Sequence, residues 1–517
     1  MNTRSKAFSN TLFSSVSIYV EYFLGMITSV FIARYMGPSD FGVYGLIIWL
    51  AGLGISLING GFPSGVIKFA AELRGAGQLD LTAVLVALMR RMQRVAMLLI
   101  LVVAAVVFFA FGTRLVPDIN TVAFGLLLLS VALRAPYMLN VSVAKGFENF
   151  RATAVMAAIG APFNLGLIIV AVLLHAPLEG FIAAYALTGL AFFLVSVWQT
   201  RGIVPPLNPA ATLPPELLSR IYRYVSYVIV MMVVSFLSAS GVEVLFLNLW
   251  DTSAAAGHFR AAYQLAYAAA LLVPGAFAAT MLPLMARSLS ENAQTARRRF
   301  IASTLYLLLM AAPLAAYGVV FSSTIIEVLY GAAYAPAGPA LAWLLAACCF
   351  VSMSAGASSF LISADRQGTA LILMLINGVI KVTLGAFLTA RFGLSGAIAS
   401  FIIAVLVNNC SQFWLAMRLS GARLPWLDFV RVLFAAAVST LPAMLAVHYL
   451  PAWPALIVGA ALLGLTYALT TLAFGCWDQH DITYMGDLAR KLMRGRPHPF
   501  ERLLAWAHTR ARRIESL

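Results

Sequence analysis

Two cations stand in the middle of long apolar runs, where a charge costs about 2.5–3.5 kcal/mol to insert into a bilayer. Arg134 lies in "LLLLSVALRAPYMLN", and Lys381 lies one turn after Asn377. Arg can grip an oxyanion with two parallel hydrogen bonds, and Lys acts as a movable point charge. Both residues are therefore predicted to line a polar cavity and to hold an anion. The alternatives are a structural pairing of Arg134 with Glu21 or a carbonyl, and snorkelling of Lys381 towards a surface.

Further polar side chains share helical faces with these cations or form faces of their own. Ser130, Arg134 and Tyr137 follow i, i+4 and i+7. Arg260, Tyr263, Gln264 and Tyr267 follow i, i+3, i+4 and i+7, which gives one face with a cation, an amide and two phenols. Such a face suits a sugar, although an interfacial aromatic belt with a snorkelling Arg would show the same pattern.

Acidic residues within the apolar runs are candidates for coupling to an ion. Glu21 lies on a polar stripe with Asn10, Ser14, Ser17, Gly25 and Thr28, and it could bind a proton or cation or could pair with Arg134. Glu243 is a second candidate, nearer the outer end of its run.

Two basic residues lie at the ends of the first apolar runs. Arg34 flanks the turn Gly37-Pro38 with Asp40, as a hairpin lock or a gate, and Lys68 could contact a headgroup phosphate.

The elements that must position these residues are membrane helices. The chain is 62% hydrophobic and only 10% charged, with a mean hydropathy of +0.92, whereas a soluble domain carries about 25% charged residues. Apolar runs long enough to cross about 30 Å of hydrocarbon recur from end to end. The sequence predicts an all-α polytopic protein with fourteen transmembrane helices, near residues 11–33, 43–67, 95–116, 121–144, 153–174, 181–200, 224–248, 261–284, 301–321, 339–362, 369–390, 394–416, 429–449 and 454–475.

The distribution of basic residues predicts the topology. With the N-terminus inside, most of the 34 Lys and Arg fall in inner segments, and Arg34, Arg114, Arg260 and Arg391 are the exceptions on the outer side. Both termini are therefore expected to be cytoplasmic, and the net charge of +15 is attributed to the membrane surface and not to nucleic acid. The four cysteines and six histidines form no metal-ligand pattern.

Internal similarity predicts two pseudo-symmetric six-helix bundles. Gly42 matches Gly257, and "LEGFIAAY" at 178–185 matches "LSGAIASF" at 394–401, at nearly the same offset. The expected organisation is an N-terminal bundle at 1–200, a cytoplasmic linker at 201–223, a C-terminal bundle at 224–420, two further helices at 421–475, and a basic cytoplasmic tail with an amphipathic helix at 476–517.

Three motifs carry a family resemblance. The first hairpin "ARYMGPSDFGVYG", the exit "GVIKFAAE" and the link "AKGFENFRA" resemble the Wzx-like polysaccharide flippases of the multidrug/oligosaccharidyl-lipid/polysaccharide (MOP) exporter superfamily. The resemblance implies a bacterial inner-membrane protein that flips an undecaprenyl-pyrophosphate-linked oligosaccharide by alternating access, for exopolysaccharide or O-antigen synthesis. Its implied partners are that lipid-linked oligosaccharide, membrane lipids and other polysaccharide-assembly proteins.

Alternatives remain within and outside transport. A drug or lipid II exporter of the same superfamily would share the motifs, and an integral-membrane enzyme or assembly scaffold is the rival from another class. The loops are short, and the sequence has no Gly-rich GxxxxGK[ST] phosphate loop, so neither a large catalytic domain nor a self-contained ATPase is expected. No cofactor is expected beyond coupling to H+ or Na+.

Overall fold

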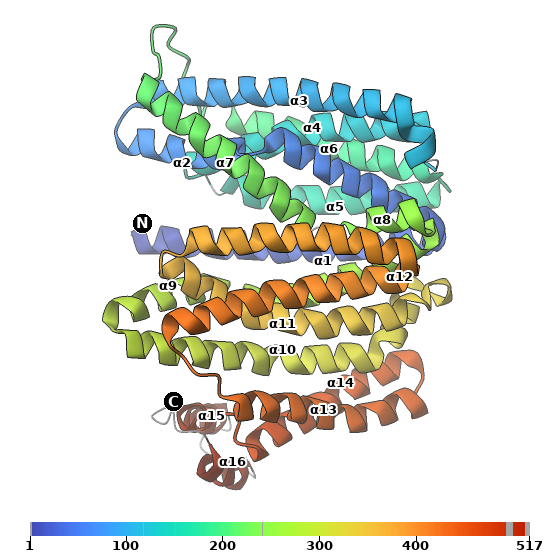
Figure 1. Cartoon of the computed structure of the whole chain (residues 1–517), viewed down its shortest axis with the longest axis vertical. Helices are drawn as coiled ribbons and strands as arrows, with labels where there is room; N and C mark the ends of the chain where they lie inside the picture. The colour runs from blue at the N-terminus through green and yellow to red at the C-terminus, as the bar shows by residue number, and fades with distance from the viewer. Residues whose placement is uncertain (1–2, 117, 150, 240, 493–499, 512–517) are drawn as a thin grey trace. The chain divides into compact units, whose positions relative to one another are not determined.

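The fold is described from a computed structural model covering residues 3–116, 118–149, 151–239, 241–492 and 500–511. All the regular elements in these ranges are helical (Figure 1). Ten helical segments within them are long and apolar enough to cross a membrane. Helices suit this environment because they satisfy every backbone N–H and C=O within one segment. The prediction of an all-α multi-pass membrane protein is confirmed.

Sixteen α-helices and one short 3₁₀ helix follow one another along the described chain. Their bounds are α1 Thr3–Asn59, α2 Phe62–Gly75, α3 Leu79–Leu115, α4 Thr121–Gly146, α5 Arg151–Leu173, α6 Leu178–Thr200, α7 Pro215–Ala239, α8 Glu243–Trp250, α9 Ser253–Glu291, α10 Ala293–Tyr330, η1 Ala332–Tyr334, α11 Ala337–Ser363, α12 Gln367–Ser420, α13 Trp426–Tyr449, α14 Ala452–Ala473, α15 Gln479–Leu492 and α16 Phe500–Arg510.

α12 contains two of the expected spans, and α1 contains the first and most of the second, which continues into α2 after Gly60. α1 is interrupted at Gly37, whose φ of 74° and ψ of 175° lie outside the helical region, and Pro38 follows. α12 is interrupted in the same way at Gly393, where φ is 54°. Glycine adopts these angles without steric cost, so the chain can turn between two helical segments. The turn predicted at Gly37-Pro38 is confirmed, and the helix pattern is consistent with fourteen spans.

The seventh expected span is broken rather than continuous. α7 ends at Ala239 and α8 begins at Glu243, with Gly241 between them at a φ of 65°. The hydrophobicity of residues 224–248 conceals this break, because the residues on both sides of it are apolar. The break leaves carbonyl groups at the end of α7 and N–H groups at the start of α8 without helical partners.

The described chain forms two compact units. The first contains residues 1–260 together with 378–397, and the second contains 261–377 together with 398–517. These units do not follow the expected boundary at 201–223, because α7, α8, the start of α9 and the middle of α12 group with the first unit. The pseudo-symmetry of two six-helix bundles stays a prediction.

A buried apolar cluster holds the first unit together. Phe69 of α2, Met89 of α3, Val143 of α4 and Val225 of α7 are all buried within it. A smaller cluster packs Trp49 of α1 against residues of α8. These contacts fix α1, α4, α7 and α8, which carry several of the predicted site residues.

The second unit is built around α10. Its cluster includes Phe300 of α10, Phe360 of α11, Phe429 of α13 and Leu463 of α14, all buried. Ala507 of α16 is fully buried and belongs to a further cluster with Leu472 and Ile482. The helix expected in the basic tail is therefore present as α16, and it packs on its own unit.

Candidate functional site

Arg134 projects from α4 towards α6 inside the first unit. Its Cζ lies 3.6 Å from the centroid of the Tyr185 ring, and its Nη2 donates a hydrogen bond of 3.2 Å to the carbonyl oxygen of Tyr185. Gly189 gives the side chain room, because a Cβ there would be 3.1 Å from Arg134 Cγ. Arg134 Nε is buried without a hydrogen-bond partner. The guanidinium is thus held by an aromatic face and one carbonyl.

Arg260 shares an aromatic neighbour, Tyr44, with Arg134. The phenol of Tyr44 on α1 interacts electrostatically with Arg260, Tyr185 and Arg134. The Cζ of Arg260 lies 5.6 Å from the Tyr44 ring centroid and 5.2 Å from that of Phe41. We call Arg134, Tyr185, Tyr44 and Arg260 the Arg–Tyr cluster. It places two cations around aromatic rings.

Lys381 lies instead in a buried ion pair. Its Nζ is 3.6 Å from Glu243 Oε1 and donates a hydrogen bond of 2.7 Å to the carbonyl oxygen of Ser238. The Lys381 side chain is 2% exposed and that of Glu243 is 0% exposed. Lys381 is therefore enclosed in an ion pair with Glu243 and does not face an open cavity in this structure, while the functional roles expected of both residues stay predictions.

The break between α7 and α8 explains why this pair forms where it does. Ser238 is in the last turn of α7, where unpaired carbonyls carry partial negative charge, and an ammonium group is favoured there. Glu243 is in the first turn of α8, where a carboxylate is favoured. Neither carboxylate oxygen of Glu243 has a hydrogen bond, although both are buried. This carboxylate depends on a single ion pair.

Four of the other predicted residues lie in the second unit. Tyr263 and Tyr267 stack with ring centroids 5.7 Å apart, and Tyr263 also meets Phe401 edge-on. Gln264 is partly buried on the same helix, α9. Asn377 is buried, and its Oδ1 has no hydrogen-bond partner. Within this unit the structure therefore brings the two phenols into contact, as the helical spacing predicts.

The remaining predicted residues lie at the edges of the first unit. Tyr137 stacks on Phe192 at a centroid distance of 4.9 Å. Arg34 is exposed at the Gly37 turn. Lys68 is exposed, with its Nζ 4.4 Å from the ring centroid of Tyr224. The side chain of Glu21 is not among those that the structure describes, so its pairing with Arg134 stays a prediction.

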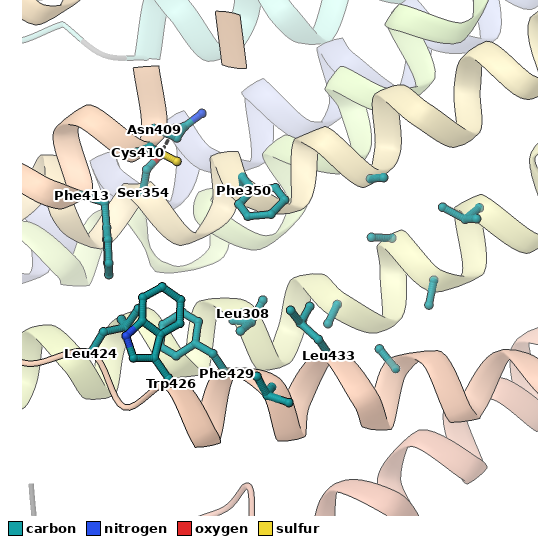
Figure 2. A pocket seen from close by; sticks show the side chains of 17 residues that line it. Leu308, Phe350, Ser354, Asn409, Cys410, Phe413, Leu424, Trp426, Phe429 and Leu433 are labelled. Atoms are coloured by element: carbon teal, nitrogen blue, oxygen red, sulfur yellow. Dashed lines mark hydrogen bonds between the residues drawn. The ribbon is translucent and has the colours of Figure 1, made fainter. Parts of the chain in front are cut away.

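An apolar cavity of about 490 Å³ lies in the second unit (Figure 2). Leu308 of α10, Phe350 of α11, Phe413 of α12 and Leu433 of α13 are among the residues that line it. Figure 2 shows Phe413, Trp426 and Phe429 gathered at one end. Ser354 donates a hydrogen bond to Asn409, so two of the few polar side chains on the wall satisfy each other. The cavity can accept a hydrocarbon chain more readily than a charged group.

Sequence reasoning missed Tyr44, Tyr185 and Ser238. Tyr185 precedes Gly189 by one helical turn, and this pairing of an aromatic with a small residue is the only sequence signal that a long side chain packs there. Tyr44 lies in the first-hairpin motif but looks like an ordinary interfacial aromatic. Ser238 acts through its backbone carbonyl, which the sequence cannot reveal unless the break at Gly241 is known.

Similarity to known proteins identifies the family and the fold of this chain. The chain matches the family model "Polysaccharide biosynthesis protein" over residues 31–339. A search of curated proteins finds no significant match. A structure of the lipid II flippase MurJ in an inward closed conformation is similar with a TM-score of 0.72 and 14% identity, covering 90% of this chain and 98% of that one.

Two further solved structures extend the similarity. An inward-facing multidrug resistance MATE family transporter of the MOP superfamily gives a TM-score of 0.63 at 13% identity, covering 78% of this chain and 94% of that one. A MOP superfamily transporter from Pyrococcus furiosus gives 0.53 at 14% identity, covering 79% and 94%. The family model covers more than half of the chain, and the fold agrees with the resemblance in the first hairpin. This chain belongs to the polysaccharide biosynthesis protein family and has the fold of the MOP exporter superfamily.

Proposed function

We propose that this protein moves an undecaprenyl-pyrophosphate-linked oligosaccharide across the bacterial inner membrane by alternating access. The observation that carries the proposal is the match of residues 31–339 to a polysaccharide biosynthesis family in a chain built almost entirely of membrane helices. Such a lipid has a tail that can stay in hydrocarbon and a charged, hydroxyl-rich head that cannot cross it unaided. A membrane protein of polysaccharide synthesis without a large extramembrane domain suits this task.

The Arg–Tyr cluster supports the assignment of the pyrophosphate end. Among the described residues, the buried Nε–H of Arg134 has no hydrogen-bond partner, and the guanidinium lies over an aromatic ring rather than against a carboxylate. A guanidinium that contacts an aromatic ring can give up that contact for a phosphate oxygen at a small cost in free energy. A cation in a buried ion pair cannot, because its carboxylate partner would be left unpaired. Arg134 and Arg260 therefore replace Lys381 in our account of the anion contacts.

The second unit by itself offers a place for a hydrocarbon chain in its apolar cavity. Its volume of about 490 Å³ and its walls of Leu, Ala and Phe suit part of a polyprenyl chain. A drug exporter could use the same walls for an apolar compound. The family match to polysaccharide biosynthesis favours the lipid-linked glycan over a drug.

The buried pair of Glu243 and Lys381 is our candidate for coupling to a proton. Protonation of Glu243 would remove the negative charge that faces the Lys381 ammonium, which also donates a hydrogen bond to the Ser238 carbonyl oxygen. Loss of one charge from a buried ion pair is unfavourable, so protonation would favour a rearrangement at the α7–α8 break. The Glu243→Gln variant is expected to bind substrate but to transport it at a rate that does not depend on an imposed pH gradient. If its transport responds to the gradient as the wild-type protein does, Glu243 does not couple transport to protons.

A cell experiment tests the function. In a strain that lacks this gene, we expect lipid-linked oligosaccharide to accumulate on the inner leaflet and surface glycan to be lost. Wild-type protein should restore the glycan, and Arg134→Ala should not restore it although the variant is present in the membrane. Arg391→Ala is the matched control, because Arg391 is exposed and lies outside the Arg–Tyr cluster. Normal surface glycan in the absence of the protein would contradict the proposal.

A further inference from the structure

The first unit also contains a cavity, and none of the Arg–Tyr cluster residues line it. It has a volume of about 790 Å³ and lies between the N-terminal half of α3 and the C-terminal halves of α4 and α6, with residues 201–207 after α6 closing one side. All these pieces come from the end of the unit where basic residues gather. The positive-inside rule expects that end to face the cytoplasm.

The charge of this cavity is of one sign. Arg90, Arg94 and Arg201 line it, and no Asp or Glu is among its lining residues. None of the three arginines forms an ion pair with an acidic side chain of the described residues. Three uncompensated guanidinium groups around one hollow create a positive potential that attracts an anion.

The wall beneath the arginines is pre-organised by hydrogen bonds. Arg90 Nη2 donates to Asn140 Oδ1 at 3.2 Å, and Asn140 donates in turn to the Ser196 hydroxyl. Gln93 Nε2 donates to Asn59 Oδ1 at 2.7 Å and to the carbonyl oxygen of Ala135. Gln93, Asn140 and Ser196 are all buried. Arg90 is therefore held in place by a satisfied polar network before any ligand arrives.

The rest of the cavity wall is mostly apolar. Val86, Met97, Leu133, Phe193 and Val197 form its other walls. Beyond Arg94, α3 exposes a row of aliphatic side chains, Val95, Leu98, Leu99 and Val102, each more than half exposed. In a membrane such a surface contacts acyl chains. A positive hollow beside a lipid-facing helix fits a molecule with an anionic head and a hydrocarbon tail.

We infer that this cavity binds the phosphate-bearing headgroup of a lipid from the adjacent leaflet, with Arg90, Arg94 and Arg201 contacting the phosphate and the chain lying along α3. Basic pockets between membrane helices are suited to anionic headgroups. The same phosphate chemistry could come from a glycerophospholipid or from a polyprenyl phosphate. The site is outside the Arg–Tyr cluster, so the inference does not depend on the proposed transport function.

Binding to the purified full-length protein tests the inference. The probes are phosphatidylglycerol, undecaprenyl phosphate, zwitterionic phosphatidylcholine and inorganic phosphate, each titrated while bound lipid is counted by native mass spectrometry. Wild-type protein should retain at least one of the two anionic lipids and prefer it to phosphatidylcholine. Arg90→Gln combined with Arg94→Gln should weaken that binding by about tenfold or more, because charge-assisted hydrogen bonds to the phosphate are lost.

Two matched controls separate the site from general charge. Arg91→Gln combined with Arg223→Gln removes the same charge from exposed positions that do not line the cavity, and it should change affinity less than about twofold. Ala87→Trp fills the cavity without removing charge and should also abolish binding, whereas Val95→Trp on the exposed side of α3 should not.

Each outcome decides the inference. If phosphatidylglycerol binds and undecaprenyl phosphate does not, the cavity is a site for a membrane phospholipid. If undecaprenyl phosphate binds and phosphatidylglycerol does not, the cavity is a site for a polyprenyl lipid. Equal affinities of the two double-arginine variants would overturn the inference, as would equal binding of phosphatidylcholine and phosphatidylglycerol. Displacement of the lipid by inorganic phosphate at equal concentration would also overturn it, because the site would then recognise a soluble anion.

Discussion

At the scale of single residues, the two intramembrane cations that the sequence singles out have different environments. Arg134 rests on the Tyr185 ring and one carbonyl, while Lys381 is enclosed with Glu243. Both are positive and mid-span, so the sequence pattern treats them alike. Their difference arises from the break between α7 and α8, which brings a carboxylate and a helix C-terminus to Lys381. Only the tertiary structure distinguishes a cation in a buried ion pair, such as Lys381, from a cation stacked on an aromatic ring, such as Arg134.

The buried pair predicts a double-mutant result. Lys381→Met should lower the free energy of unfolding by about 3–5 kcal/mol, because it leaves the Glu243 carboxylate without its ion pair. Glu243→Gln should also destabilise the protein, and the combination should be more stable than Lys381→Met alone. Thermal unfolding of the four proteins in one detergent measures this coupling. Additive losses would mean that the two side chains do not interact in the folded protein.

At the scale of helices, two glycines that the internal repeat relates are close-packing positions in the first unit. A Cβ on Gly42 of α1 would lie 1.8 Å from the carbonyl oxygen of Ser253, and a Cβ on Gly257 of α9 would lie 2.0 Å from that of Pro38. The start of α9 therefore crosses the turn of the first hairpin with backbone against backbone. The sequence match identified these positions but could not indicate that they contact each other's helices.

This crossing makes each glycine intolerant of a methyl group. Gly42→Ala and Gly257→Ala should each destabilise the protein by about 1–3 kcal/mol or more, because the backbones must separate. Gly25→Ala is the control on α1, since nothing lies within 4 Å of a Cβ at that position, and it should not destabilise. Melting temperatures in detergent compare the three variants. Unchanged melting temperatures for both crossing variants would contradict this packing.

At the scale of the whole molecule, composition and hydropathy were sufficient to predict an all-helical membrane protein, and the first hairpin was sufficient to predict its superfamily. Hydropathy could not locate the break between α7 and α8, because it measures polarity and not backbone geometry. It also could not indicate that residues 378–397 group with the first unit, since that depends on long-range packing. The cavity with Arg90 was missed because its arginines were interpreted as topology signals alone.

The topology itself is open to a direct check. Ser39 follows the Gly37 turn and Gln78 precedes α3, and both are exposed. In a variant with the native cysteines replaced by serine, Ser39→Cys should react with a membrane-impermeant maleimide on intact cells. Gln78→Cys should react only after the cells are opened. The reverse pattern would show that the N-terminus is outside and that the basic end of the first unit faces away from the cytoplasm.

The central claim, translocation of a lipid-linked oligosaccharide through contacts with Arg134, is tested most directly in proteoliposomes. Purified protein is reconstituted with an undecaprenyl-pyrophosphate-linked oligosaccharide in both leaflets, and a membrane-impermeant enzyme that cleaves the glycan is added outside. Wild-type protein should expose nearly all of the substrate, Arg134→Lys should do so more slowly because it loses the bidentate geometry, and Arg134→Ala should leave the inner half protected. When lipid II replaces the oligosaccharide in this assay, the inner half of the lipid II should stay protected from the enzyme even with wild-type protein. Full exposure of the oligosaccharide by Arg134→Ala, or protection of half of it by wild-type protein, would contradict the account.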